Sequence, residues 1–365
     1  MKGNPFKFGS VVDGPYFTDR EDELRKMASY INSENHFILI SPRRFGKTSL
    51  MRKIVNESER IYIFLDFQIV FSAEDLASQL LKRVYRIYPV QKLKNYIKSF
   101  RLIPTVSINP VTGEPEISFK PGSKELTPLE DVLNLIEKLG TDTNKILVVL
   151  DEFQDIFRIN SGLDRFLRSV MQNHRHINYI FMGSSESMIR EIFEKKSSPF
   201  YRFGTLMTLG KIDPEKFTLF LEQKFIEITD RGKDLSGKIL HITDSHPYYT
   251  QQLAFGVWEL LLHSGYSSDI VETAANEIVQ GHDNDYERLW STFNRTDMMV
   301  LNGMSASNIS PLSEAFSRQF GTGAASTVFS TLQRLTRKGI LLKEGSVYSI
   351  DDPFFKRWIV FRRNA

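Results

Sequence analysis

The chain has 365 residues, of which 41% are hydrophobic and 25% are charged, a composition typical of a globular protein with more than one domain. Its 47 Lys and Arg residues against 44 Asp and Glu residues leave a formal charge of +3, so charge alone does not indicate a nucleic-acid-binding protein. The lack of cysteine excludes disulfides, thiolate zinc sites and cysteine nucleophiles. No apolar run reaches the ~20 residues of a membrane span, so we expect a cytoplasmic protein without membrane contact.

Four short apolar runs predict buried strands, at residues 36–40, 61–67, 145–151 and 177–185. Helical patterns separate them, including one from about Lys47 to Ile54 and others at 73–88 and 128–139. Unalternated strands with helices between them predict an α/β fold with a parallel sheet flanked by helices. Residues 104–119 alternate on both sides of NPVTGEP and predict an inserted β-hairpin.

After Gly210 the strand patterns give way to amphipathic helices, which predict a helical lid domain over 211–280. Its Tyr248, Tyr249 and Trp258 lie at helical spacing and are predicted to be core residues. From about Asp283 another unit begins, with a helix ending in Lys-Gly and then a hairpin turning at Gly345. This order predicts a winged-helix domain over 285–365, following a core domain over 1–210.

The segment ILISPRRFGKTSL, residues 38–50, has the residues of a phosphate-binding loop between a strand and a helix. Gly46 lets the backbone approach phosphate, Lys47 brings an ammonium group that we expect at the protein surface, and Thr48 offers a hydroxyl to Mg²⁺. Ser41 replaces the usual first glycine, and Pro42 after it can form the turn by fixing φ. The predicted nucleotide-binding loop comprises Ser41, Pro42, Arg43, Arg44, Phe45, Gly46, Lys47, Thr48 and Ser49.

The two loop arginines have alternative interpretations. Arg43 and Arg44 either contact phosphate or a partner, or are solvated on an exposed loop.

A second motif, ILVVLDEFQDI, ends an apolar strand in two carboxylates. Asp151 is predicted to bind Mg²⁺ together with Thr48, and Glu152 to act as the general base on water. Paired with the loop about a hundred residues upstream, this motif predicts Mg²⁺-dependent nucleotide binding and hydrolysis. Asp66, at the end of an earlier strand, either extends the metal's outer shell or caps the next turn.

Six segments in order resemble the archaeal-type ATPases, a branch of the STAND class of P-loop NTPases related to the AAA+ proteins. They are PFKFGSVVDGPYFTDREDEL, SPRRFGKTSL, VVLDEFQDI, FMGSSESMI, SSPFYRFGTLMTLGKI and HPYYTQQL. The resemblance extends over essentially the whole chain, including the winged helix. It implies that Phe17 and Arg20 lie near the adenine and that Ser184 is the polar sensor of the γ-phosphate or of the attacking water.

The resemblance also implies roles for residues later in the chain. Arg202 matches an arginine that approaches the γ-phosphate, although its neighbouring glycine follows it here rather than preceding it. His246 and Pro247 match the pair in the lid that packs on the nucleotide, with Ser245 in place of the usual glycine.

Together these features predict an ATPase whose cofactors are ATP or ADP and Mg²⁺. We interpret the chain as an ATP-hydrolysing conformational switch, in which ATP closes the lid over the core and hydrolysis moves the winged helix. Two alternatives stay open: a DNA-associated ATPase resembling archaeal replication initiators, and a nucleotide-binding module with negligible turnover.

The winged helix has two interpretations of its own, DNA binding and docking on protein. The basic residues that favour DNA are Arg318, Arg334, Arg337 and Lys338. Asp351 and Asp352 follow the wing, and a patch of this size supplies only a few phosphate contacts. We therefore favour a protein partner, with DNA as the open alternative, and the sequence leaves the oligomeric state of the chain open.

Overall fold

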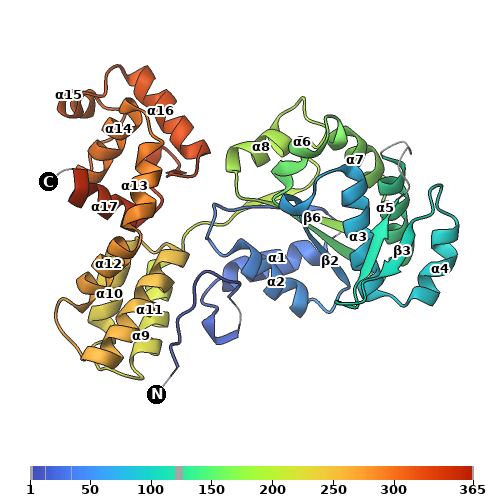
Figure 1. The fold of residues 1–365 in the computed structure, drawn as a ribbon, viewed down its shortest axis with the longest axis horizontal. Coiled ribbons are helices and arrows are strands. Elements are labelled where there is room, and N and C mark those ends of the chain that lie inside the picture. The colour runs from blue at the N-terminus through green and yellow to red at the C-terminus, as the bar shows by residue number, and fades with distance from the viewer. Residues whose placement is uncertain (1–2, 13, 34, 120–125, 364–365) are drawn as a thin grey trace. The chain divides into compact units, whose positions relative to one another are not determined.

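The computed structural model describes residues 3–12, 14–33, 35–119 and 126–363 (Figure 1). The chain divides into two compact units. The sheet unit contains residues 21–41 and 50–209, and the C-terminal unit contains residues 1–20, 42–49 and 210–365. The loop predicted to bind phosphate thus belongs to the C-terminal unit by its packing. The predicted domain boundaries stay a prediction.

A five-stranded parallel sheet forms the centre of the sheet unit, with the strand order β2-β5-β6-β1-β7. Its strands are β1 (Phe37–Ile40), β2 (Tyr62–Asp66), β5 (Ile146–Asp151), β6 (Ile177–Gly183) and β7 (Thr205–Thr208). The four predicted strands are confirmed. The sequence analysis missed β7, because this edge strand has only four residues and three of them are merely half-buried.

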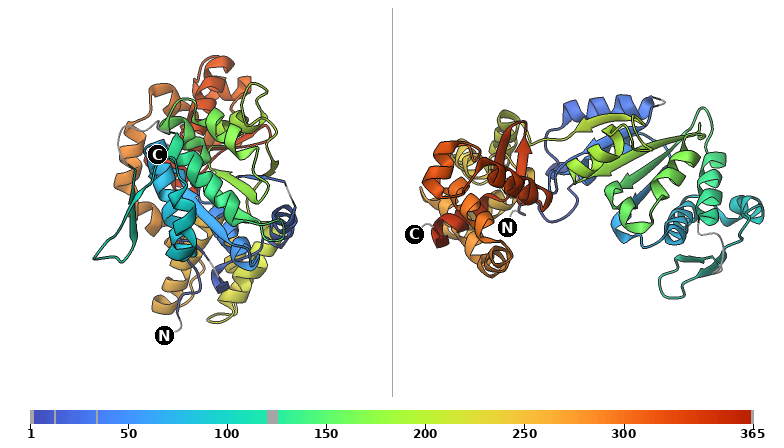
Figure 2. Two further views of the ribbon diagram at one scale, coloured as in Figure 1. Left: turned by 90° about the vertical axis from the view of Figure 1, so that its right-hand side faces the viewer. Right: turned by 90° about the horizontal axis from the view of Figure 1, so that it is seen from above.

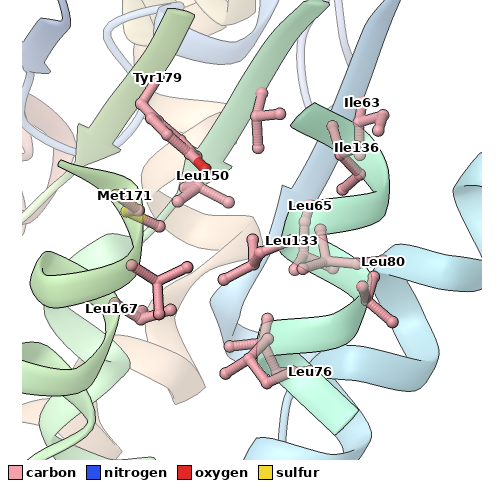
Figure 3. Packing of buried hydrophobic residues seen from close by; sticks show 14 of the residues in the cluster. Ile63, Leu65, Leu76, Leu80, Leu133, Ile136, Leu150, Leu167, Met171 and Tyr179 are labelled. Atoms are coloured by element: carbon pink, nitrogen blue, oxygen red, sulfur yellow. The ribbon is translucent and has the colours of Figure 1, made fainter. Parts of the chain in front are cut away.

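Helices cover both faces of the sheet, as Figure 2 shows. Residues of β1, β2, β5 and β6 on one face join a buried cluster with α3 (Ala73–Ile87), α5 (Thr127–Leu139) and α7 (Leu163–Met171). In Figure 3, Leu80 of α3 and Leu133 of α5 lie near Leu65 of β2. On the other face, Tyr30 of α1 (Glu21–Asn32) stacks on Phe37 with ring centroids 5.1 Å apart. Arg52 of α2 (Lys47–Glu57) lies 5.8 Å from the Phe64 ring on that same face.

The inserted hairpin is also confirmed, as β3 (Thr105–Ile108) pairs antiparallel with β4 (Pro115–Ser118). The remaining elements of the sheet unit are short. They are η2 (Phe67–Ile69), α4 (Val90–Lys98), η3 (Phe153–Asp155), α6 (Ile156–Ile159) and α8 (Glu186–Glu194).

The C-terminal unit begins with η1 (Gly14–Tyr16) and continues after residue 210 with the lid helices and the winged helix. The lid helices are α9 (Pro214–Phe225), α10 (Gly232–Thr243), α11 (Pro247–Ser264) and α12 (Ile270–Gly281). The elements after them are α13 (Asp283–Ser291), α14 (Arg295–Ala306), α15 (Glu314–Phe320), α16 (Ala325–Arg337), β8 (Leu341–Glu344), β9 (Val347–Ile350) and α17 (Pro353–Arg363).

One hydrophobic cluster runs through both the lid and the winged helix and includes Trp258 and Trp358. Gly345 turns the predicted wing with a φ of 62°. Among the described helices, none is long and apolar enough to cross a membrane.

Two glycines give a matched test of this packing. An added Cβ at Gly183, the last residue of β6, would overlap Gln154 Oε1 and the Ile189 side chain. Gly237 is exposed in the middle of α10, and no atom outside the neighbouring turns of that helix lies within 4 Å of its Cβ position. We expect Gly183→Ala to lower the free energy of unfolding by about 1–3 kcal/mol and Gly237→Ala to raise it by about 0.5–1 kcal/mol. Urea denaturation measures both, and a Gly183→Ala protein as stable as the parent would contradict the close packing.

Candidate functional site

Polar groups gather where the parallel strands of the sheet end. The backbone N–H of Ser41, directly after β1, donates to the carbonyl oxygen of Gly183 at 3.2 Å, so the loop leaves the sheet beside the end of β6. Asp151 is the last residue of β5, is 5% exposed, and pairs in register with Asp66 of β2. The Asp66 carboxylate accepts from the backbone N–H of Gln68 at 2.8 Å and so caps η2, one of its two predicted roles.

Glu152 is held in a defined position at this edge. Its backbone has a left-handed conformation with φ 50°, and its N–H donates to Asp151 Oδ1 at 2.9 Å. The carboxylate oxygen Oε2 accepts from Ser184 Oγ at 2.7 Å, from Ser184 N at 3.1 Å, and from the Gln154 side chain. The structure therefore brings together Glu152 and Ser184, two of the predicted catalytic residues. It also adds Gln154, which sequence reasoning missed although it stands two residues after Glu152 in DEFQD.

The loop's backbone explains which positions need glycine. Of residues 41–49, all of which the structure describes, only Arg44 (φ 67°) and Gly46 (φ 86°) have positive φ. Ser41 is fully buried without a left-handed backbone, so its replacement of glycine introduces no strain. Pro42 is half-buried and Arg43 is exposed.

Two other loop residues, Lys47 and Ser49, are buried. Lys47 is 7% exposed, so the expectation of a surface ammonium was wrong. The reason is its position at the first turn of α2, which follows the tight turn of the loop. Ser49 Oγ accepts from the backbone N–H of Val12 at 2.9 Å and ties the amino-terminal segment to the loop.

Arg20 connects the loop to the chain that enters the lid. It is 4% exposed, and its guanidinium donates to the carbonyl oxygens of Gly210 at 2.8 Å, Lys211 at 3.4 Å and Phe45 at 3.5 Å. Phe17, the other residue predicted near the adenine, is half-buried after η1. The adenine role of both stays a prediction, whereas the carbonyl contacts show that Arg20 fixes backbone positions.

The His-Pro pair lies at the start of α11 and packs on the loop. His246 Nδ1 accepts from the Tyr248 N–H at 3.2 Å, and Pro247 begins the helix. The His246 ring contacts the Phe45 ring, with centroids 4.7 Å apart in an edge-to-face arrangement. Asp244 and Ser245 both have left-handed φ values, 50° and 55°, which explains why a glycine suits the position before His246.

Arg202 does not join the residues at the carboxyl edge. It lies three residues before β7, whose first residue Thr205 pairs with Phe37 at the start of β1. The neighbouring Phe203 ring contacts His36, with centroids 4.5 Å apart. The backbone of Arg202 therefore lies at the amino-terminal end of the strands. Glu152 lies at their carboxyl end, and the two ends are separated by the length of β1, about four residues or ~13 Å. The contact of Arg202 with the γ-phosphate stays a prediction.

The residues predicted to bind metal suit Mg²⁺ in their chemistry. Thr48 and Asp151 supply a hydroxyl and a carboxylate, the hard oxygen donors that Mg²⁺ prefers, and Mg²⁺ commonly uses one or two protein ligands with phosphate and water. Within the described ranges, no group of three or more His, Asp or Glu side chains is arranged to hold a metal ion. The donor set therefore fits an ion held together with a nucleotide.

Comparison with known proteins identifies the family. A model of an ATPase domain found predominantly in Archaea matches residues 17–253, more than half of the chain. The chain belongs to this family. A second model, of a probable winged-helix domain, matches residues 284–360 of this ATPase-family chain.

One curated relative matches part of the chain. A Methanocaldococcus jannaschii protein of uncharacterized function is 24% identical over 251 residues, covering 67% of this chain and 46% of that protein. The chain therefore spans less than half the length of this relative.

Two solved structures share the fold. The Walker-type ATPase of Pyrococcus abyssi has a TM-score of 0.67 and 19% identity, covering 94% of this chain and 96% of its own. The Aeropyrum pernix ORC2 protein, solved as ADPNP–ADP complexes, has a TM-score of 0.56 and 16% identity, covering 97% and 96%. Both likenesses cover the whole architecture and confirm the predicted P-loop ATPase fold with a winged helix.

The Arg20 contacts generate a test that needs no nucleotide. Arg20→Ala removes hydrogen bonds from a buried, charged donor to backbone carbonyl groups, so we expect the free energy of unfolding to fall by about 2–3 kcal/mol. Arg25→Ala is the control, because that side chain is 77% exposed and forms a surface ion pair with Asp22. Thermal unfolding of the nucleotide-free proteins compares them. Equal melting temperatures for Arg20→Ala and the parent would show that Arg20 does not hold the backbone.

Proposed function

We propose that this ATPase-family protein is a Mg²⁺-dependent, ATP-hydrolysing conformational switch of the STAND type. The observation that carries the proposal is the Glu152 carboxylate, held by Ser184 and Gln154 at the edge of the sheet where the phosphate-binding loop begins. A left-handed backbone at a non-glycine residue costs stability and is kept where function or packing requires it. Holding nucleotide would not require a carboxylate aimed in this way, so the arrangement favours turnover over passive binding.

Each residue has a role in this mechanism. The N–H groups at the start of α2 and the Lys47 ammonium bind the phosphates, and Thr48 and Asp151 would hold Mg²⁺. The ion would neutralise charge on the phosphate oxygens. Glu152 orients the attacking water and accepts its proton, and Ser184 fixes the carboxylate that does so.

The lid and the winged helix respond to the nucleotide as one body in this proposal. They share a hydrophobic cluster, and Lys211 pairs with Asp244 of the lid at 2.6 Å and with Glu344 of the wing at 3.5 Å. Separating them would expose that cluster to water, so we infer that the switch moves them together. These contacts dock the winged helix on the lid of the same chain.

Substitutions of the neighbouring residues Glu152 and Asp151 should affect different steps, hydrolysis and Mg²⁺-dependent binding. In Glu152→Gln the side-chain shape is kept and the base is lost, so we expect ATP hydrolysis to fall about 10²- to 10⁴-fold with nucleotide affinity unchanged or higher. Asp151→Asn should instead weaken Mg²⁺-dependent ATP binding itself. Steady-state phosphate release and equilibrium binding of an ATP analogue, measured side by side, distinguish these outcomes. Hydrolysis by Glu152→Gln at the parental rate would mean that Glu152 is not the base.

DNA association is the second candidate function. It is favoured by the likeness of the fold to the Aeropyrum pernix ORC1 protein in complex with DNA, with a TM-score of 0.53, 14% identity, and 99% and 98% of the two chains covered. Two of the basic side chains predicted to contact DNA are paired with carboxylates of the same chain. Arg334 pairs with the buried carboxylate of Asp297 at 2.5 Å, and Arg318 pairs with Glu314 at 3.1 Å. Arg337 and Lys338 stay exposed at the end of α16.

With so few exposed cations on α16, binding of the full chain to random duplex should be weak. We expect the plot of log affinity against log salt concentration to have a slope shallower than about −3, since each phosphate contact contributes about −0.9. Fluorescence anisotropy between low and moderate salt measures this slope. A steep slope with tight, sequence-dependent binding would instead make DNA association the primary function.

A further inference from the structure

A cavity of about 320 Å³ lies within the C-terminal unit, and a loop arginine forms part of its wall. Its lining includes the rings of Tyr248 and Tyr249 from α11, Tyr286 from α13, and the carboxylates of Asp351 and Asp352 just before α17. We call these five residues the tyrosine cage. Aromatic faces and carboxylates together form an environment that suits a cation. The cation present is the guanidinium of Arg44.

Arg44 makes specific contacts with the cage. Its Nη1 donates to the Tyr249 hydroxyl oxygen at 2.6 Å. The guanidinium carbon lies 5.0 Å from the Tyr248 ring centroid and 5.7 Å from that of Tyr249. Desolvation is the main cause that raises the pKa of the Tyr249 hydroxyl, so the group stays neutral and can accept this bond.

The cage is built from the winged helix as well as from the lid. The Asp352 carboxylate accepts from the Tyr286 hydroxyl at 3.0 Å and from the backbone N–H of Phe354 at 2.8 Å, which caps α17. Burial raises the pKa of Asp352, and the Arg44 charge partly opposes that effect. Losing Arg44 from the cage would therefore remove a favourable charge from the carboxylate that starts α17.

The next residue of the loop makes a parallel connection. Phe45 contacts the His246 ring, and His246 Nε2 faces Asp351 Oδ1 at 3.4 Å. Two consecutive loop residues, Arg44 and Phe45, thus contact Tyr249 and His246 at the start of α11, and His246 in turn faces Asp351.

We propose that the tyrosine cage holds Arg44 as a latch, and that nucleotide phosphate competes with the cage for this guanidinium. The inference rests on the proposed function, because the competitor is the triphosphate bound by the same loop. Arg44 has a positive φ two residues before Gly46, so a loop that rearranges around phosphate changes the backbone that positions the guanidinium. The guanidinium borders a cavity and can leave without opening a packed core. When Arg44 leaves the cage, the contacts that hold the start of α17 weaken. Nucleotide binding therefore changes the stability of the winged helix.

The test compares two matched substitutions on adjacent residues of α11. Tyr249→Phe removes the hydroxyl that accepts from Arg44 and keeps the ring, whereas Tyr248→Phe leaves both that bond and the cation–π contact. The cage and the nucleotide compete for Arg44, so a weaker cage leaves more of the binding free energy to the nucleotide. We therefore expect Tyr249→Phe to bind a non-hydrolysable Mg²⁺–ATP analogue about three- to tenfold more tightly than the parent. Tyr248→Phe should bind as the parent does.

Hydrogen exchange provides the second readout. In the parent, the analogue should increase amide exchange at the start of α17, and in Tyr249→Phe this exchange should be high already without nucleotide. If the parent binds the analogue but Tyr249→Phe shows unchanged or weaker affinity, the latch is overturned and the proposed function stands. If the parent binds no nucleotide, the proposed function fails and the latch fails with it.

Discussion

The loop of residues 42–49 is the constraint on which the rest of this structure depends. In the chain it follows β1 and opens α2, yet by its packing it belongs to the C-terminal unit. Arg20 fixes the backbone at Phe45 and at Gly210, so the loop and the entry to the lid are bonded to the same guanidinium. A loop tied in this way cannot change its conformation around a ligand without disturbing the contacts of the lid.

The carboxyl edge of the parallel sheet imposes a second constraint. Parallel strands end together, so residues that are distant in sequence meet there without any local signal. Glu152 occupies this edge with a left-handed backbone, which is unfavourable for a non-glycine residue, and its carboxylate gains hydrogen bonds from Ser184 and Gln154. Gly183 admits Gln154 because any side chain at that position would overlap it. The arrangement of the carboxylate therefore depends on a glycine that makes no polar contact through a side chain.

The C-terminal unit combines the lid and the winged helix around one hydrophobic cluster. A winged helix that bound DNA independently of the lid would need its basic residues free and its core separate. Arg334 instead pairs with the buried Asp297, and the carboxylates before α17 face the lid and the loop. The lid and the winged helix of this chain thus pack as one body, and the loop residues Arg44 and Phe45 contact it through Tyr249 and His246.

The sequence by itself determined four of the five sheet strands, the hairpin, the loop motif and the Asp151–Glu152 pair, because these features arise from local periodicity and from residue chemistry at fixed spacing. Only the tertiary structure decided that Ser184 and Gln154 hold Glu152, and that the backbone of Arg202 lies at the amino-terminal end of the strands. Tyr249 shows the difference most clearly. Its helical spacing correctly predicts a buried ring, but the partner of its hydroxyl is Arg44, 205 residues away in the chain. Periodicity reports which face of a helix is buried, whereas the group that meets a given atom depends on the packing of distant segments, which no local pattern contains.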